Sequence, residues 1–283
     1  MNQNDASPAG AGDPDRRSAS AGGRPPFAAS GAFGPDATGP DVPGEPDDQR
    51  GMRRGGVGSS ADDPRVRWGF PTALGSLLSF LVVSAALAFL FSAIGLDPVA
   101  GSVIATVVGW LGLAGLPLVV SRIRGAGPVA DLALRFRLVD LAIGSGAFLV
   151  LMVSASVFVG IYLRVTGEVP TSALGTAAED STRSWQLVLL ALLAVGASLV
   201  EEVHFRGMWW NLLRRKGLGQ WATLLVTSLL FAVIHVEPQR VVLLFVAGFV
   251  IGFVRMRTGR LGPAVVAHFL VNGFGAIGLF TSL

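Results

Sequence analysis

Long apolar stretches occupy most of the chain after residue 68 and limit what it can fold into. About 20 consecutive apolar residues cross the hydrocarbon of a bilayer as an α-helix. The stretches lie at 69–94, 99–120, 140–163, 185–213, 221–236, 241–254 and 262–283. We therefore predict about seven membrane crossings, of which the sixth is short enough to be tilted, partial or re-entrant.

The composition agrees with a protein that crosses a membrane several times. The mean hydropathy is +0.59 and only 14% of the residues are charged, which is too apolar for an ordinary soluble domain. The stretches lack the period-two alternation of barrel strands, and lipid offers no partners for unpaired backbone groups, so each crossing should be a helix. The predicted fold class is all-α, a polytopic transmembrane helix bundle.

The first part of the chain has a different character. Residues 1–68 are rich in Gly, Pro, Ala, Asp and Arg and show no sustained apolar period. Such a segment does not bury enough apolar surface to fold. It also lacks the apolar core that a cleaved signal peptide has near its start. We predict a disordered cytoplasmic tail at 1–68 and a transmembrane helical domain at 69–283.

Basic residues mark the orientation of this domain. The sequence pI of about 10.4 accompanies a formal net charge of only +3, and the arginines flank apolar stretches, so they indicate topology rather than a nucleic-acid partner. They lie before the first stretch and after the second, fourth and sixth: Arg65, Arg67, Arg122, Arg124, Arg135, Arg137, Arg214, Arg215, Lys216, Arg255, Arg257 and Arg260. Positive loops face the cytoplasm. We expect a multi-pass protein of the cell membrane with a cytoplasmic N-terminus.

Polar groups inside three of the apolar stretches indicate a functional site. The chain has three histidines, and each belongs to a short polar segment: 201–206, 231–235 and 268–272. Ionisable side chains are costly in hydrocarbon and usually face a cavity or a partner. Counting inward from the basic loops at the helical rise places all three segments at similar depth. The sequence therefore predicts one buried polar site.

The first segment offers two neighbouring acids with different surroundings. Glu202 and Arg206 stand four residues apart on one helical face, in the order that favours an ion pair. Glu201 points about 100° away from Glu202 and is the freer acid. A carboxylate beside an apolar wall suits a general base that takes a proton from water and later returns it. His204 receives no catalytic role.

The other two segments add hydrogen-bonding groups. His235 follows Phe231 by one helical turn, and His268 and Asn272 repeat this spacing on the last stretch. His268 and Asn272 could stabilise an oxyanion while Glu201 and His235 hold the attacking water. Alternatively, His235, His268 and Glu201 could bind Zn²⁺ with water as the fourth ligand. The chain has no cysteine, so a metal would need such His and carboxylate ligands.

These residues together resemble the CPBP family of intramembrane proteases, which includes the CAAX prenyl endopeptidase of the Rce1 type and Abi-type bacteriocin-immunity proteins. The family pattern is Glu-Glu-x-x-x-Arg, then Phe-x-x-x-His, then His-x-x-x-Asn or Asp. The matching positions are Glu201, Glu202, Arg206, Phe231, His235, His268 and Asn272. Three ordered motifs are far more specific than one. The resemblance covers a catalytic core at about 185–278.

The resemblance implies an intramembrane endopeptidase that hydrolyses a peptide bond of a membrane-associated peptide or protein. In it, Glu201 would activate water with His235 as partner, and His268 with Asn272 would form the oxyanion or ligand pair. Glu202, Arg206 and Phe231 would be supporting residues. The family is described both as zinc-dependent and as metal-free, so both mechanisms stay open. A noncatalytic membrane scaffold or immunity protein and a transporter are the alternative classes; no convincing internal repeat supports a transporter.

Overall fold

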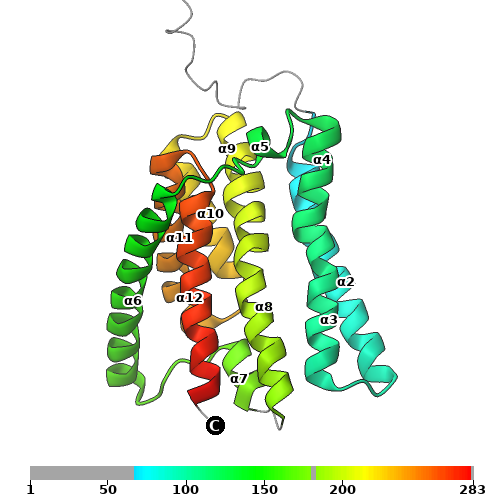
Figure 1. Ribbon diagram of the computed structural model, residues 1–283, viewed down its shortest axis with the longest axis vertical. Helices are drawn as coiled ribbons and strands as arrows, with labels where there is room; N and C mark the ends of the chain where they lie inside the picture. The colour runs from blue at the N-terminus through cyan, green and yellow to red at the C-terminus, as the bar shows by residue number, and fades with distance from the viewer. Residues whose placement is uncertain (1–66, 180–182, 282–283) are drawn as a thin grey trace, which may run out of the picture. The chain divides into compact units, whose positions relative to one another are not determined.

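The structure is a computed structural model that describes residues 67–179 and 183–281 (Figure 1). Nearly all of the predicted tail at 1–68 lies outside the described residues. Within the described ranges every regular element is a helix, which confirms the all-α fold class. Each of the apolar stretches coincides with one helix or with a run of helices.

Five helical segments are long and apolar enough to cross a membrane: Phe70–Ala93, Pro98–Arg124, Val139–Thr166, Ser184–Arg215 and Pro238–Thr258. They comprise α2 (Phe70–Ala93), α3 (Pro98–Trp110), η2 (Leu111–Gly115), α4 (Leu116–Arg124), α6 (Val139–Thr166), α8 (Ser184–Glu202), η3 (Val203–Trp209), α9 (Trp210–Arg215), η4 (Pro238–Arg240) and α11 (Val241–Thr258). The elements η2 and η3 are π-helical turns inside otherwise continuous helices. Two short helices, α5 (Pro128–Asp131) and α7 (Ala173–Glu179), lie in connections.

Two further apolar helices are shorter, and one expectation about length was wrong. Helix α10 spans Gln220–Ile234 and α12 spans Gly262–Thr281. The sixth stretch, expected to be short, continues through polar residues to Thr258 and qualifies as a crossing. Arg255 and Arg257 ended the apolar run in the sequence, but arginine is a good helix former, and the helix ends only at Gly259, which adopts a φ of 68°.

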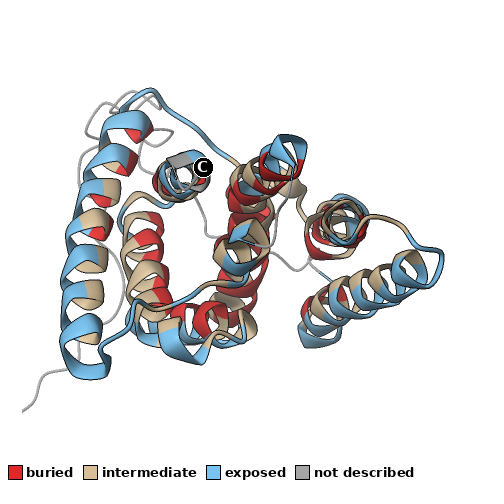
Figure 2. Cartoon of the chain, turned by 90° about the horizontal axis from the view of Figure 1, so that it is seen from below, coloured by how far each residue is buried: buried red, intermediate tan, exposed pale blue. Residues whose placement is uncertain are grey.

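The helices differ in how much of their surface faces outward. In the most apolar 18-residue stretch of each helix, only 6% of the residues of α2 and 11% of those of α6 are buried. The corresponding share for the segment Ser184–Arg215 is 39%. In Figure 2 the buried residues of α6 lie on the side turned toward the other helices, and its outer side is exposed. The many exposed large apolar side chains of α2 and α6 suit contact with lipid. The segment α8–η3–α9 is the inner helix between α2–α4 and the remaining helices (Figure 1).

Glycines set the close contacts around α11, where Gly248 and Gly252 have the Gly-x-x-x-Gly spacing of closely packed membrane helices. A Cβ at Gly248 would lie 3.0 Å from the Cα of Ser228, and one at Gly252 would lie 2.6 Å from Leu224 Cδ1. Both neighbours belong to α10. The absence of side chains therefore lets the backbones of α10 and α11 approach closely, which brings the Gly248 carbonyl within reach of residues in the bundle interior.

The basic connections gather at one end of the bundle. Arg67 N–H donates to Arg124 O over 2.7 Å, and the Arg215 guanidinium lies 3.7 Å from the centre of the Trp68 ring. Arg260 pairs with the buried carboxylate of Asp140, and this hydrogen bonding raises the pKa of Arg260. These contacts join loops that precede α2, follow α4 and α9, and precede α12. The loops that the sequence places on one side of the membrane do lie together.

We predict that Gly144→Ala destabilises the contact between α6 and α12, because a Cβ there would meet Val266 Cγ1 at 2.6 Å and Pro263 O at 2.9 Å. Overpacking of this kind costs about 1–3 kcal/mol. Gly146→Ala is the matched control on the same helix, since a Cβ there meets nothing within 4 Å. Thermal unfolding of the purified protein in detergent should show a lower midpoint for Gly144→Ala alone. Equal midpoints for the two variants would contradict the packing described here.

Candidate active site

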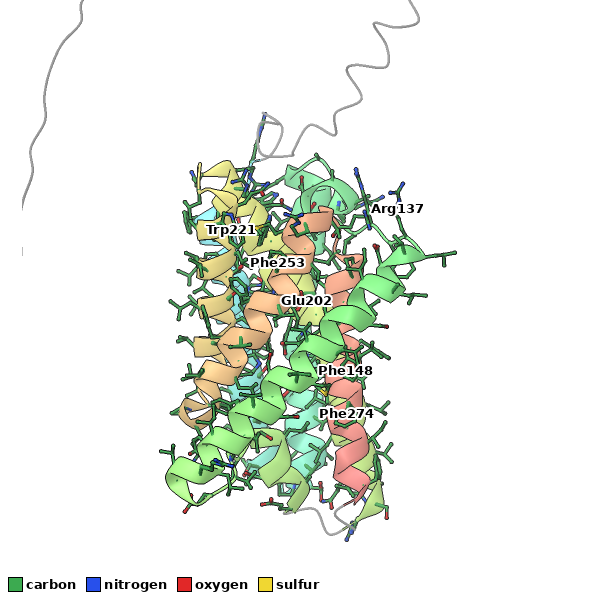
Figure 3. All side chains as sticks on the ribbon, turned by 90° about the vertical axis from the view of Figure 1, so that its left-hand side faces the viewer. Arg137, Phe148, Glu202, Trp221, Phe253 and Phe274 are labelled. Carbon is green, nitrogen blue, oxygen red and sulfur yellow. The ribbon has the colours of Figure 1, made fainter. Side chains whose placement is uncertain are left out.

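The three polar segments meet inside the bundle. Glu201 comes from the last turn of α8, His235 follows the last residue of α10, and His268 lies on α12. Glu201 Oε2 is 3.9 Å from His235 Nε2 and 3.8 Å from His268 Nε2. Neighbouring Glu202 lies about midway between the two ends of the helices (Figure 3). The structure therefore brings residues of all three segments together in one place.

Glu202 and Arg206 form the ion pair that their spacing predicted. Arg206 Nη1 lies 2.8 Å from Glu202 Oε1, and both side chains are completely buried. Arg206 Nη2 also donates to the Gly248 carbonyl over 3.0 Å. The guanidinium carbon is 4.6 Å from the centre of the Phe231 ring, a cation–π distance. The arginine is thus held by an acid on its own helix, a carbonyl of α11 and a ring of α10.

Arg206 lies in the π-helical turn η3, which begins directly after Glu202. Such turns are rare, are mostly single, and often occur at functional sites. Arg255 Nε donates to the main-chain carbonyl of Arg206 over 3.2 Å, and the Arg255 side chain is itself buried. A carbonyl freed from regular helix geometry must find another partner in hydrocarbon. The contact from α11 therefore supports this turn.

Hydrogen bonds fix which ring nitrogen of each site histidine carries the proton. His235 Nδ1 lies 2.6 Å from Phe231 O, and His268 Nδ1 lies 2.8 Å from Glu202 Oε1. A carbonyl and an ionised carboxylate only accept hydrogen bonds, so both Nδ1 atoms must donate. In the neutral imidazole form of each ring, the Nε2 atom is then an acceptor. Both Nε2 atoms face Glu201.

Three acceptor atoms consequently converge on one point. Glu201 Oε2 is buried and has no hydrogen-bond partner among the described residues, and the two Nε2 atoms lie 3.9 Å and 3.8 Å from it. A buried acceptor without a donor costs about 1–3 kcal/mol. The arrangement therefore favours a small group that carries protons or positive charge, and a water molecule with its two hydrogens fits this requirement.

Exposure divides the site into an accessible and an inaccessible part. The side chains of Glu201 and His235 are 19% and 26% exposed, whereas those of Glu202 and Arg206 are fully buried. His268 lies between these groups with 6% exposed. A substrate can therefore contact Glu201 and His235, while Glu202 and Arg206 act only through other residues.

The side chain of Asn272 contacts the backbone of α8. Its Nδ2 donates to the carbonyl of Ala194 on α8 over 2.7 Å. One amide hydrogen therefore ties α12 to α8 two turns before Glu201, and none of its described contacts reaches Glu201 or His235. His268 turns both ring nitrogens toward the two glutamates. The paired oxyanion role of His268 and Asn272 stays a prediction.

The side chains that could bind zinc lie close together, but their ligand atoms are farther apart than in a tetrahedral zinc site. Ligand atoms about 2 Å from a tetrahedral zinc are about 3.3 Å apart, and Glu201 Oε2 is 3.8 Å and 3.9 Å from the two Nε2 atoms. In the part of the chain that the structure describes, no group of three or more His, Asp or Glu side chains is close enough to hold a metal ion. The arrangement as it stands does not fit zinc.

Some contacts of the site had no signal in the sequence. The main-chain carbonyl of Gly248 binds Arg206. The partner of Asn272 is likewise a main-chain carbonyl, and backbone atoms carry no residue-specific pattern. The buried arginine Arg255 was read as a topology marker because it lies in a basic cluster at the end of an apolar stretch.

A bundle of apolar helices with a buried Glu–His site defines a polytopic membrane protein with groups suited to hydrolysis. Residues 183–274 match the family model described as "Type II CAAX prenyl endopeptidase Rce1-like". This match confirms the resemblance found in the sequence and covers nearly the predicted core at 185–278. It supports a CAAX-protease-like intramembrane endopeptidase in general, and with it a peptide or protein substrate. No curated protein and no solved structure matches the chain.

We predict that Arg206→Ala lowers the stability and folded yield of the protein, because it leaves Glu202 buried without its cationic partner. Breaking a buried pair in this way costs about 3–5 kcal/mol. The double variant Glu202→Gln, Arg206→Gln removes both charges and should recover part of the yield. Size-exclusion chromatography and thermal unfolding in detergent measure both effects.

Arg137→Ala is the matched control for Arg206→Ala, since Arg137 is exposed at the basic end of the bundle (Figure 3). It should leave the folded yield unchanged. A fully stable Arg206→Ala protein that has lost only activity would show instead that Arg206 contacts the substrate.

Proposed function

We propose that the protein is an intramembrane endopeptidase in which Glu201 is the general base that activates water. The observation that carries this proposal is the convergence of Glu201 Oε2 with the Nε2 atoms of His235 and His268, at 3.9 Å and 3.8 Å. Glu201 is also the acid of the pair whose side chain is partly exposed. A general base must reach both the water and the substrate.

The reaction follows from where the protons lie. Water donates one hydrogen to Glu201 Oε2 and the other to a histidine Nε2, so its own lone pair is directed away from the three acceptors. Glu201 removes a proton as the water oxygen attacks the peptide carbonyl, and a tetrahedral intermediate forms. The same carboxyl group then gives its proton to the leaving amine as the C–N bond breaks. Glu201 ends the cycle ionised, as it began.

Stabilisation of the oxyanion is assigned to His268 together with Asn272. Glu202 lies 2.8 Å from His268 Nδ1, where its negative charge would compensate a positive charge on the ring, as an acid behind a histidine does in the Ser-His-Asp triad. Nε2 of His268 would take the second proton of the attacking water, share it with the developing oxyanion, and give it up to the product amine at the end of the cycle. Asn272 contributes the amide hydrogen that does not bind Ala194.

Zinc is the second candidate for this site, and one observation favours it. Histidines that bind a metal usually donate their other ring N–H to a carboxylate or a carbonyl, as His235 and His268 do. Bound zinc would supply a polarised water and a Lewis acid. The separations of 3.8 Å and 3.9 Å are too wide for its ligands, so the steps given above depend on water and protein groups alone.

The proposal also covers the location of the protein and of its substrate. We assign the protein to the cell membrane with the basic loops and the N-terminus in the cytoplasm, following the charge of those loops. The substrate is a peptide or protein segment held at or in the bilayer, because the site lies among membrane-spanning helices.

We predict that Glu201→Gln yields a folded, membrane-inserted protein that has lost peptide cleavage, because the amide keeps the shape of the side chain but does not accept the proton. Removing a general base costs about 10²–10⁴-fold in rate. Membrane fractions from cells with the wild-type and the variant protein should differ in cleaved peptides when analysed by mass spectrometry. Glu168→Gln, a matched change at an exposed acid, should cleave like wild type.

The same preparations decide between water and zinc. Metal content measured by mass spectrometry should show no stoichiometric zinc, and chelation should leave cleavage unchanged. Stoichiometric zinc that is lost on chelation together with activity would support the zinc alternative. Cleavage by Glu201→Gln at the wild-type rate would refute the base assignment under either mechanism.

A further inference from the structure

The third histidine, His204, is fully buried in the π-helical turn η3 and takes no part in the proposed reaction. Its contacts lie on the side of the helix that faces the first helices of the chain. Nδ1 is 3.3 Å from Ser76 Oγ on α2 and 3.2 Å from Leu113 O in η2. Nε2 is 3.0 Å from Nε1 of Trp209.

These partners occupy both ring nitrogens of His204, so neither is available as a base or a ligand. The Trp209 indole only donates, so His204 Nε2 must accept and Nδ1 must carry the proton. Nδ1–H then donates to Leu113 O and Ser76 Oγ. The Ser76 hydroxyl in turn donates to Gly112 O over 2.8 Å. Each ring nitrogen is satisfied by a defined partner, which suits a link between helices rather than a base or a ligand.

The link joins two π-helical turns that face each other. His204 belongs to η3, and the carbonyls of Gly112 and Leu113 belong to η2. Where a helix departs from α geometry in hydrocarbon, freed backbone groups must be satisfied by neighbouring helices and by side chains such as Ser. Ser76 and His204 supply these hydrogen bonds from α2 and η3. The carbonyls of η2 are therefore supported by a side chain of η3 and one of α2.

Close packing beside the link supports the same connection. A Cβ at Gly196 of α8 would lie 2.7 Å from Cη2 of Trp110, so the Trp110 ring of α3 lies directly on the α8 backbone. Trp110 is the residue before η2, and Gly196 lies two turns before His204. The packing of Trp110 against Gly196 is thus a second contact between the same two helical segments that the His204 hydrogen bonds connect.

The position of η3 determines the alignment of the site. This turn starts at the residue after Glu202 and contains Arg206, and Glu202 binds His268 Nδ1. We propose that His204 is a positioning residue: through Ser76 and Leu113, helices α2–α4 hold η3 in the register that aligns Glu202 with His268 and Glu201 with the attacking water. The proposal rests on the proposed function. It gives a role to helices that lie outside residues 183–274.

The test begins with His204→Phe, which keeps the size and shape of the ring but removes both hydrogen-bonding nitrogens. The variant should lower kcat by about 100-fold, the effect of a misplacement near 1 Å, with KM unchanged because no substrate contact is lost. His204→Asn places an amide N–H where Nδ1 was and should recover at least part of kcat. Unchanged kcat in a folded His204→Phe protein would overturn the proposal.

A matched pair on α2 keeps the test decisive if His204→Phe does not fold. Ser76→Ala removes the hydroxyl that contacts His204 and Gly112, whereas Ser84→Ala removes a buried hydroxyl that has no hydrogen-bond partner among the described residues. Ser76→Ala should lower kcat and speed amide hydrogen exchange in residues 203–209. Ser84→Ala should do neither. Equal kcat and equal exchange in the two variants would contradict the proposal that the Ser76–His204 hydrogen bonds hold η3 in position.

Hydrogen exchange also separates this proposal from the proposed function. If wild type cleaves peptides and Ser76→Ala speeds exchange without lowering kcat, the link is only structural and the positioning role is wrong, while the proposed function stands. If wild type cleaves nothing, the proposed function fails and the positioning role fails with it. Faster exchange together with a lower kcat and an unchanged KM supports the positioning role.

Discussion

The buried ion pair between Glu202 and Arg206 is the interaction on which the rest of the site depends. Transferring two charges out of water costs several kcal/mol per ion, and only good geometry with further hydrogen bonds offsets this cost. The structure supplies these bonds from other helices: His268 on α12 binds the acid, and Gly248 on α11 and Phe231 on α10 contact the arginine. One pair on α8–η3 thus brings together the three remaining core helices.

The ion pair also gives the two neighbouring glutamates different roles. Glu201 is adjacent to Glu202 but points to a different side of the helix, where its side chain is partly exposed. His268 contacts both acids, with Nδ1 on Glu202 and Nε2 facing Glu201. The supporting acid therefore sets the tautomer of the ring that faces the reactive acid. Two neighbouring glutamates perform two tasks because the helix turns about 100° between them.

The sequence predicted the parts of this arrangement that follow from composition and helical spacing. Apolar length indicated the helices, and the i, i+4 spacing indicated the Glu202–Arg206 pair, because both are properties of one segment. The two π-helical turns and the partner of Asn272 involve main-chain atoms of other helices, which leave no local pattern. The end of α11 was missed because an apolar run and a helix stop for different reasons: polarity at Arg255, and backbone conformation at Gly259.

The tautomers of the site histidines test the central claim, the convergence of three acceptors on the attacking water, most directly. The chain contains only three histidines, so ¹⁵N-histidine NMR of the protein in lipid bilayers can resolve each ring after assignment with single His variants. The account predicts that His235 and His268 are both protonated at Nδ1 and unprotonated at Nε2 near neutral pH. A proton on Nε2 of either ring in the resting enzyme would contradict it, because Glu201 would then already have its donor.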